Sequence, residues 1–180
     1  MTLEEMKAKT LLMIEEYNED EDTLSNDEDI GAKLNTVINQ IQNELVRIKK
    51  ISAYTTMQVT EGQQINISDI AEDIYQLNVI KGVDYEPIGD FILFNEDGTA
   101  QIYYYRYPEQ INQETEDDYE FELSTDLLEI MPYGVAGDIL KSDVSETYGN
   151  IYYNRYKELL SGLDPRNHTG SIYIDGGVDI

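Results

Sequence analysis

The chain has 180 residues, with 37 acidic and 12 basic side chains and a formal net charge of −25. Tight binding of DNA over an extended surface is excluded, because that binding needs clustered Lys and Arg. An acidic wall would instead let DNA slide past it, since like charges repel; the alternative is that the charge only keeps the protein soluble. The absence of cysteine excludes disulfides and thiolate metal sites. No apolar run approaches the roughly 20 residues that span a bilayer, so no membrane association is expected.

Two helices are predicted in the first third of the chain. Thr2 and Glu5 have the T-x-x-E spacing of a capping box, and apolar residues at helical spacing predict a helix over about 3–17. A second capping box at 25–28 precedes the longest apolar stripe, which predicts a helix over about 26–50.

The middle of the chain favours strands. Residues 74–80 alternate with a period of two, and 91–94 and 101–107 flank an Asp-Gly turn, which predicts a hairpin. In its second strand Ile102 and Tyr104 should face one way, and three tyrosines should face the other: Tyr103, Tyr105 and Tyr107. Tyrosine is enriched at protein interfaces, so these three are candidate interface residues; the alternative is a half-buried face of the chain's own sheet.

Two more helices are predicted over about 126–140 and 147–163. The last has a predicted buried stripe of seven apolar and aromatic residues: Tyr148, Ile151, Tyr152, Tyr156, Leu159, Leu160 and Leu163. The sequence therefore predicts an α+β fold: a mainly helical core of about four helices, an inserted small antiparallel β-subdomain and an extended β-prone C-terminal tail. The expected divisions are a helical core over 1–52 and 124–163, a β-rich insertion over 53–123, and a tail over 164–180.

The tail contains a short β-prone segment, formed by Ser171, Ile172, Tyr173 and Ile174. Such a segment after the last helix has two possible positions. It adds a strand to the chain's own sheet, or it adds a strand to a neighbouring chain. The sequence leaves both open.

Residues that carry chemistry are sparse. The acidic segment over 18–29 does not match the EF-hand pattern, because Leu24 stands where the third ligand should be. The acidic run over 114–118 shows no opposed pair of carboxylates. His168 is the single histidine, and no phosphate-binding loop or nucleophile elbow occurs. We therefore expect no enzyme, no cofactor and no metal site.

The segment over 126–143, DLLEIMPYGVAGDILKSD, is similar to a recurrent helix of the head–tail connector (neck adaptor) proteins of tailed bacteriophages. Arg155 and Tyr156, followed by Leu159 and Leu160, resemble the R-Y-x-x-L-L of the last helix in that family. The order of parts, two helices, a β-rich insertion and two helices, also resembles the family and covers nearly the whole chain.

This resemblance implies a structural virion protein without enzymatic activity. Its subunits would form a ring, usually of about twelve, that docks on the portal protein in the neck of the virion. The ring would extend the DNA channel toward the next neck or tail-completion protein, with DNA passing without tight binding. Before assembly the subunit would lie in the host cytoplasm, and the tail would reach the portal or a neighbouring subunit.

Two other classes of function remain open at this point. An acidic binding module could mimic DNA and occupy a nucleic-acid-binding protein, but the acids are dispersed rather than spaced like phosphates along one face. A hydrolase with carboxylates distant in sequence is the third possibility, with Glu116 and Asp118 as its candidates.

Overall fold

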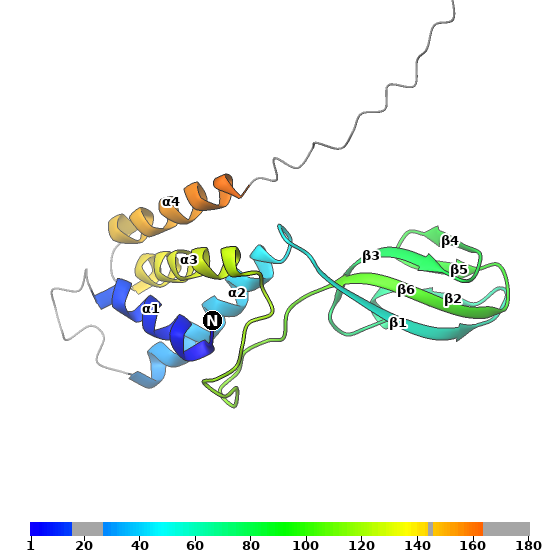
Figure 1. Ribbon diagram of the computed structural model, residues 1–180, viewed down its shortest axis with the longest axis horizontal. Coiled ribbons are helices and arrows are strands. Elements are labelled where there is room, and N and C mark those ends of the chain that lie inside the picture. The colour runs from blue at the N-terminus through cyan, green and yellow to red at the C-terminus, as the bar shows by residue number, and fades with distance from the viewer. Residues whose placement is uncertain (16–26, 144–145, 164–180) are drawn as a thin grey trace, which may run out of the picture.

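The computed structural model describes residues 1–15, 27–143 and 146–163. In these residues the chain is mixed α+β, with four helices and two small antiparallel sheets (Figure 1), as the sequence predicts; the predicted tail over 164–180 lies outside them. The helices are α1 (Leu3–Glu15), α2 (Asp27–Leu45), α3 (Thr125–Asp143) and α4 (Glu146–Gly162). The strands are β1 (Ile51–Val59), β2 (Gln64–Asn66), β3 (Ile74–Lys81), β4 (Tyr85–Ile88), β5 (Phe91–Phe94) and β6 (Gly98–Arg106), with a short 3-10 helix η1 (Ile67–Asp69) after β2.

Helix α1 begins with the predicted capping box. The Thr2 amide donates to the Glu5 carboxylate at 3.1 Å, and the Glu5 amide donates to the Thr2 hydroxyl at 3.2 Å. These bonds satisfy two amides that the first turn of a helix leaves without partners. The buried Leu3, Met6 and Ile14 then anchor α1 in the helical core.

Helix α2 ends at Leu45, earlier than the predicted residue 50. The chain leaves the helix through a tight turn, in which the Leu45 carbonyl accepts from the amides of Ile48 and Lys49. The strand β1 begins two residues later, at Ile51. Lys49 pairs with Asp126 at the start of α3 rather than with the end of its own helix.

The segment over 107–123 belongs to the helical body, although the sequence prediction included it in the β-rich insertion over 53–123. Its residues Ile111, Phe121 and Leu123 lie in the core cluster of the helices. Helix α2 holds the segment with amide side chains, because Asn39 both donates to the Ile111 carbonyl and accepts from the Ile111 amide, and Gln42 donates to the Glu109 carbonyl. The β-rich part therefore ends at residue 106 and not at 123.

Helices α3 and α4 pack closely because glycines lie where they meet. A Cβ placed on Gly149 of α4 would lie 2.6 Å from the Lys141 nitrogen and 2.9 Å from the Gly137 carbonyl oxygen of α3. Tyr152 and Tyr156 are buried beside this contact, whereas Tyr148 and Ile151 are 40% and 50% exposed. The predicted stripe of α4 is therefore confirmed for Tyr152 and Tyr156 and wrong for Tyr148 and Ile151. Near the start of α4 the small Gly149, and not these bulkier side chains, meets α3.

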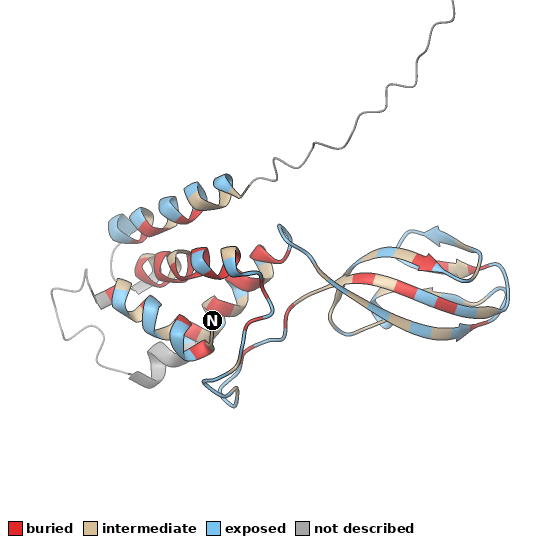
Figure 2. Cartoon of the chain, in the orientation of Figure 1, coloured by how far each residue is buried: buried red, intermediate tan, exposed pale blue. Residues whose placement is uncertain are grey.

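The two sheets pack against each other to form a β-module (residues 51–106) with its own small core (Figure 2). Their orders are β1-β6-β3 and β2-β5-β4, and all neighbours are antiparallel. The core between them consists of Val59, Ile80, Ile92, Phe94, Ala100 and Ile102.

The predicted hairpin of 91–94 with 101–107 is wrong in its pairing. Both runs are strands, but β5 lies in one sheet and β6 in the other, so the Asp97-Gly98 corner crosses between sheets. The Asp97 carboxylate accepts from the Glu61 amide at 2.7 Å, which fixes the corner against the β1–β2 turn. The true hairpin joins β4 to β5 through Gly89, whose φ of 61° suits glycine.

We predict that Gly149→Ala destabilises the protein by about 2–3 kcal/mol, because the added methyl group meets backbone atoms that cannot move independently of α3. Urea unfolding measures the change. Gly162→Ala is the matched control, since its methyl group meets no atom within 4 Å, and it should change the unfolding free energy by less than about 1 kcal/mol. Equal stability of the two variants would contradict the close packing of α3 on α4.

Candidate functional site: the tyrosine face

The outer surface of the sheet β1-β6-β3 carries a row of tyrosines, here called the tyrosine face: Tyr54, Tyr75, Tyr103, Tyr105 and Tyr107. Strand β6 is central, and its side chains alternate as predicted: Ile102 and Tyr104 are buried, while Tyr103 and Tyr105 are half-buried on the opposite surface. Tyr54 of β1 lies directly across from Tyr103 in the register. The pairing thus brings together aromatic rings that are far apart in the sequence.

The rings of the tyrosine face contact one another. Tyr54 stacks on Tyr103 with centroids 5.8 Å apart, and Tyr75 lies 6.4 Å from Tyr105 and 4.9 Å from Tyr107. Each such pair contributes about 0.5–1.5 kcal/mol beyond its buried area. Burial, together with the neighbouring Tyr105 and Tyr107, raises the pKa of Tyr75, so its hydroxyl stays protonated.

Three cations cover these rings. The ammonium of Lys81 lies 5.1 Å from the Tyr103 ring centre, that of Lys50 lies 4.3 Å from Tyr105, and the guanidinium of Arg47 lies 5.9 Å from Tyr107. An aromatic ring attracts a cation through its negative face. The tyrosine face is therefore positively charged in a chain with a large negative charge.

Carboxylates are absent from this sheet. None of the residues of β1, β3 and β6 is Asp or Glu, although 37 acids occur in the chain. On β1 the residues that face outward with Tyr54 are the polar, uncharged Ser52, Thr56 and Gln58. The surface thus combines aromatic, polar and positively charged groups.

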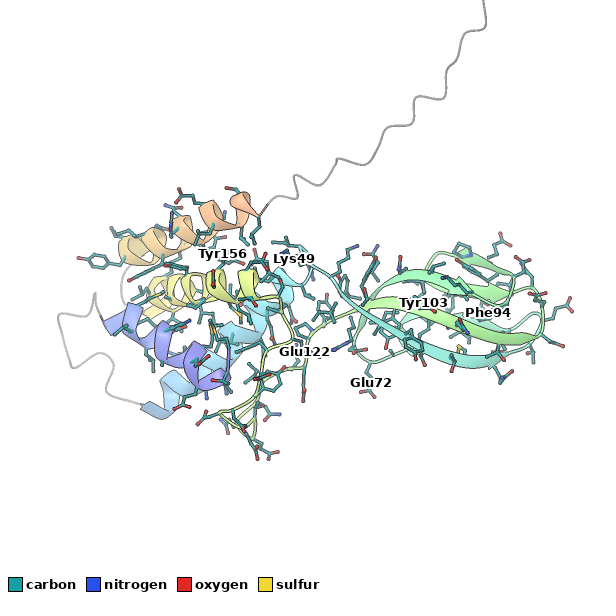
Figure 3. The ribbon with its side chains drawn as sticks, viewed as in Figure 1. Lys49, Glu72, Phe94, Tyr103, Glu122 and Tyr156 are labelled. Carbon is teal, nitrogen blue, oxygen red and sulfur yellow. The ribbon has the colours of Figure 1, made fainter. Side chains whose placement is uncertain are left out.

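The tyrosine face is tied to the helical body at the junction of the two parts of the chain. The Tyr75 hydroxyl donates to the Val46 carbonyl at 3.3 Å, and the Arg47 guanidinium donates to the Tyr107 hydroxyl at 2.9 Å. Lys49 lies near this junction (Figure 3) and pairs with Asp126 at the start of α3.

An ion-pair cluster forms the second part of this junction. Arg106, the last residue of β6, donates two bonds to the Glu122 carboxylate and lies 3.7 Å from that of Asp73. Glu122 also accepts from the Glu109 amide at 3.0 Å. These bonds to the ionised form, chiefly that from Arg106, lower the pKa of Glu122.

The other predicted site residues have mixed outcomes. Three of them lie outside the described residues: the tail segment 171–174, His168 and most of the acidic segment over 18–29. The acidic run over 114–118 lies on the loop between Ile111 and Phe121, where the carboxylates of Glu114, Glu116 and Asp118 are exposed.

The described residues contain neither a cluster of metal ligands nor a helix that could span a membrane. Among residues 1–15, 27–143 and 146–163, no group of three or more His, Asp or Glu side chains is placed to hold a metal ion. In the same ranges, none of the helices has the length and apolar character to cross a bilayer.

Sequence reasoning missed Tyr54, Tyr75 and the three cations of the tyrosine face. Tyr54 and Tyr103 become neighbours only through the antiparallel pairing of β1 with β6. Tyr75 joins the row beside a bulge in β3, where the register shifts between Ile74 and Gln76. The alternation of side chains along a strand predicts which of that strand's tyrosines share a face. It does not predict which other strand lies beside it.

A scan against protein-family models finds no match for this chain, and a search of the curated proteins finds none either.

We predict that Glu122→Gln lowers the unfolding free energy by about 1 kcal/mol at pH 7, because Arg106 then loses the closer of its two carboxylate partners and keeps only Asp73. The folded-state pKa of Glu122 lies below its ordinary value of 4.5. Its ionised form therefore stabilises the fold above that pH, and the stabilisation is lost as the pH falls through the lowered pKa. Urea unfolding of both proteins between neutral and acidic pH should show curves that converge in acid.

Glu120→Gln is the control, because this neighbouring carboxylate is exposed and forms no ion pair among the residues that the structure describes. It should leave stability nearly unchanged at every pH. A constant difference between Glu122→Gln and wild type across the whole pH range would contradict the role of the ion pair.

Proposed function

We propose that this chain is a ring-forming head–tail connector of a tailed bacteriophage, a structural virion protein without enzymatic activity. The observation that carries the proposal is the arrangement of the chain. Helices from before and after the insertion share one core, and the β-module projects from that body (Figure 1). The same order of parts underlies the resemblance to connector proteins, together with the segment around Met131, Pro132 and Tyr133.

The physical properties of the chain suit such a role. The close glycine contact of α3 with α4 gives the helical body a tightly packed core, as a stiff ring subunit needs. The ion pairs of Arg106 hold the β-module against that body. The net charge of −25 lets DNA pass through a channel without adhering to it.

The proposed partners follow from this role. About twelve copies would assemble on the portal protein, present a surface to the next neck or tail-completion protein, and remain in the neck of the virion. The free subunit should be monomeric, because copies that each carry −25 repel one another, and salt screens exposed charges only beyond about 8–10 Å. A template would supply the contacts that overcome this repulsion.

Electron microscopy of the purified protein mixed with portal rings of the same virus tests the proposal. We expect a symmetric collar of added density beneath the portal. A bare portal beside free monomer, at high protein concentration and across a range of salt, would contradict the connector function. Competition with DNA for a basic protein would then favour the acidic binding module.

A truncation at Gly170 tests the proposed role of residues 171–174. Within the described residues, both core clusters are formed by side chains from 1–163, and we expect the shortened chain to unfold at the same urea concentration as the full chain. We expect it to fail in neck assembly, because a donated strand would be missing. A truncated chain that still completes virions would refute the strand donation.

A further inference from the structure

Self-repulsion limits how two copies of this chain can approach each other. Carboxylates outnumber cations threefold, so most contacts between copies would bring acid against acid. The sheet β1-β6-β3 is different, because its strands contain no Asp or Glu. A neighbouring copy meets the least repulsion on this surface.

The tyrosine face also offers groups that recognise carboxylates. Lys50, Lys81 and Arg47 are exposed and lie over the rings, where they can donate to an incoming anion. Tyr54 is 69% exposed, and among the described residues its ring stacks on that of Tyr103. Partly exposed tyrosines beside cations are the groups that dominate binding energy at protein interfaces.

The densest described run of carboxylates lies on another part of the same chain. Residues 112–120, here called the acidic loop, carry Glu114, Glu116 and Asp118, which are exposed and form no ion pair among the described residues. Its base is fixed to α2, since Asn39 binds Ile111 and Asn35 donates to the Asn112 carbonyl at 3.0 Å. The loop is thus presented in a defined position.

We propose that the tyrosine face of one copy binds the acidic loop of a neighbouring copy. The two surfaces differ, so the contact is heterologous and propagates from subunit to subunit, as a ring requires. This inference rests on the proposed ring function and specifies its lateral contact. The Lys and Arg side chains would pair with Glu114, Glu116 and Asp118, and the tyrosine rings would pack against the loop.

A strand of nucleic acid stacking on the tyrosines is the competing occupant. Aromatic rows with cations bind single-stranded nucleic acid in other proteins. Three cations lie over the rings of the tyrosine face, which is few for a polyanion, and the net charge of −25 opposes its approach. A short acidic loop requires far fewer positive charges, so the observations favour the neighbouring copy.

Disulfide trapping in the full-length chain tests the proposal, because the protein has no cysteine of its own. One chain carries Thr56→Cys on the tyrosine face, and a second carries Asp118→Cys on the acidic loop. They are mixed in a glutathione redox buffer at low salt, and the covalent dimers are separated by mass. Trapping captures brief contacts, so it works even if the free subunit is monomeric.

We expect the mixed dimer in large excess over the amount that random collision gives, with the excess falling as salt is added. Gln64→Cys, on the outer surface of the other sheet, replaces Thr56→Cys as the control and should give only the random amount. The proposal would be overturned if Thr56→Cys gave no more mixed dimer than random collision gives. A random yield from Thr56→Cys together with tight binding of a single-stranded oligonucleotide to the tyrosine face would overturn it in favour of nucleic acid.

Charge reversal shows whether trapping depends on these particular charged side chains or only on the net charge of the chain. Lys50→Glu with Lys81→Glu should lower the trapped yield about tenfold, as expected for two attractions turned into repulsions. Adding Glu114→Lys and Glu116→Lys to the partner chain should restore it. Lys9→Glu with Lys157→Glu changes net charge equally on the helical body and should have little effect; an equal loss there would overturn the contact.

The outcomes also separate this inference from the proposed function. A collar on the portal together with a random trapping ratio would leave the connector function standing and reject the contact. A specific trapped dimer without any collar would support the contact and reject the portal-bound ring.

Discussion

The structure depends on the alternation of side chains along β6. Because this strand is central, its inward residues Ala100 and Ile102 close the core of the β-module, and its outward Tyr103 and Tyr105 form the middle of the tyrosine face. Its last residue, Arg106, makes the ion pairs with Glu122 and Asp73 that join the β-module to the helical body. One strand thus supplies a core, a surface and a junction, and a shift of one residue would exchange the first two.

The distribution of charge gives this arrangement its functional meaning. A chain with 37 acidic residues has few surfaces on which another copy can come close without strong electrostatic repulsion. Strands β1, β3 and β6 form such a place, because they lack carboxylates and are flanked by Lys50, Lys81 and Arg47. In the proposed ring, the same acidity that would keep DNA mobile in the channel would restrict contacts between copies to a small part of the surface.

Junction and surface are also physically coupled. Tyr75 belongs to the tyrosine face and at the same time donates to the Val46 carbonyl of the helical body, and Arg47 covers Tyr107 from the turn after α2. A partner bound on the tyrosine face would therefore contact groups that fix the β-module in position. Binding there would order the junction as well as bury the rings.

The sequence by itself determined the elements that depend on local patterns. The capping box of Thr2 and Glu5, the stripe of α2 and the alternation around Tyr103 all follow from neighbours within a few residues. Only the tertiary structure decided that β5 and β6 lie in different sheets, that the segment over 107–123 packs on the helical body, and that Tyr54 stacks on Tyr103. These features depend on contacts between residues far apart in the chain, and periodicity carries no information about which distant segments meet.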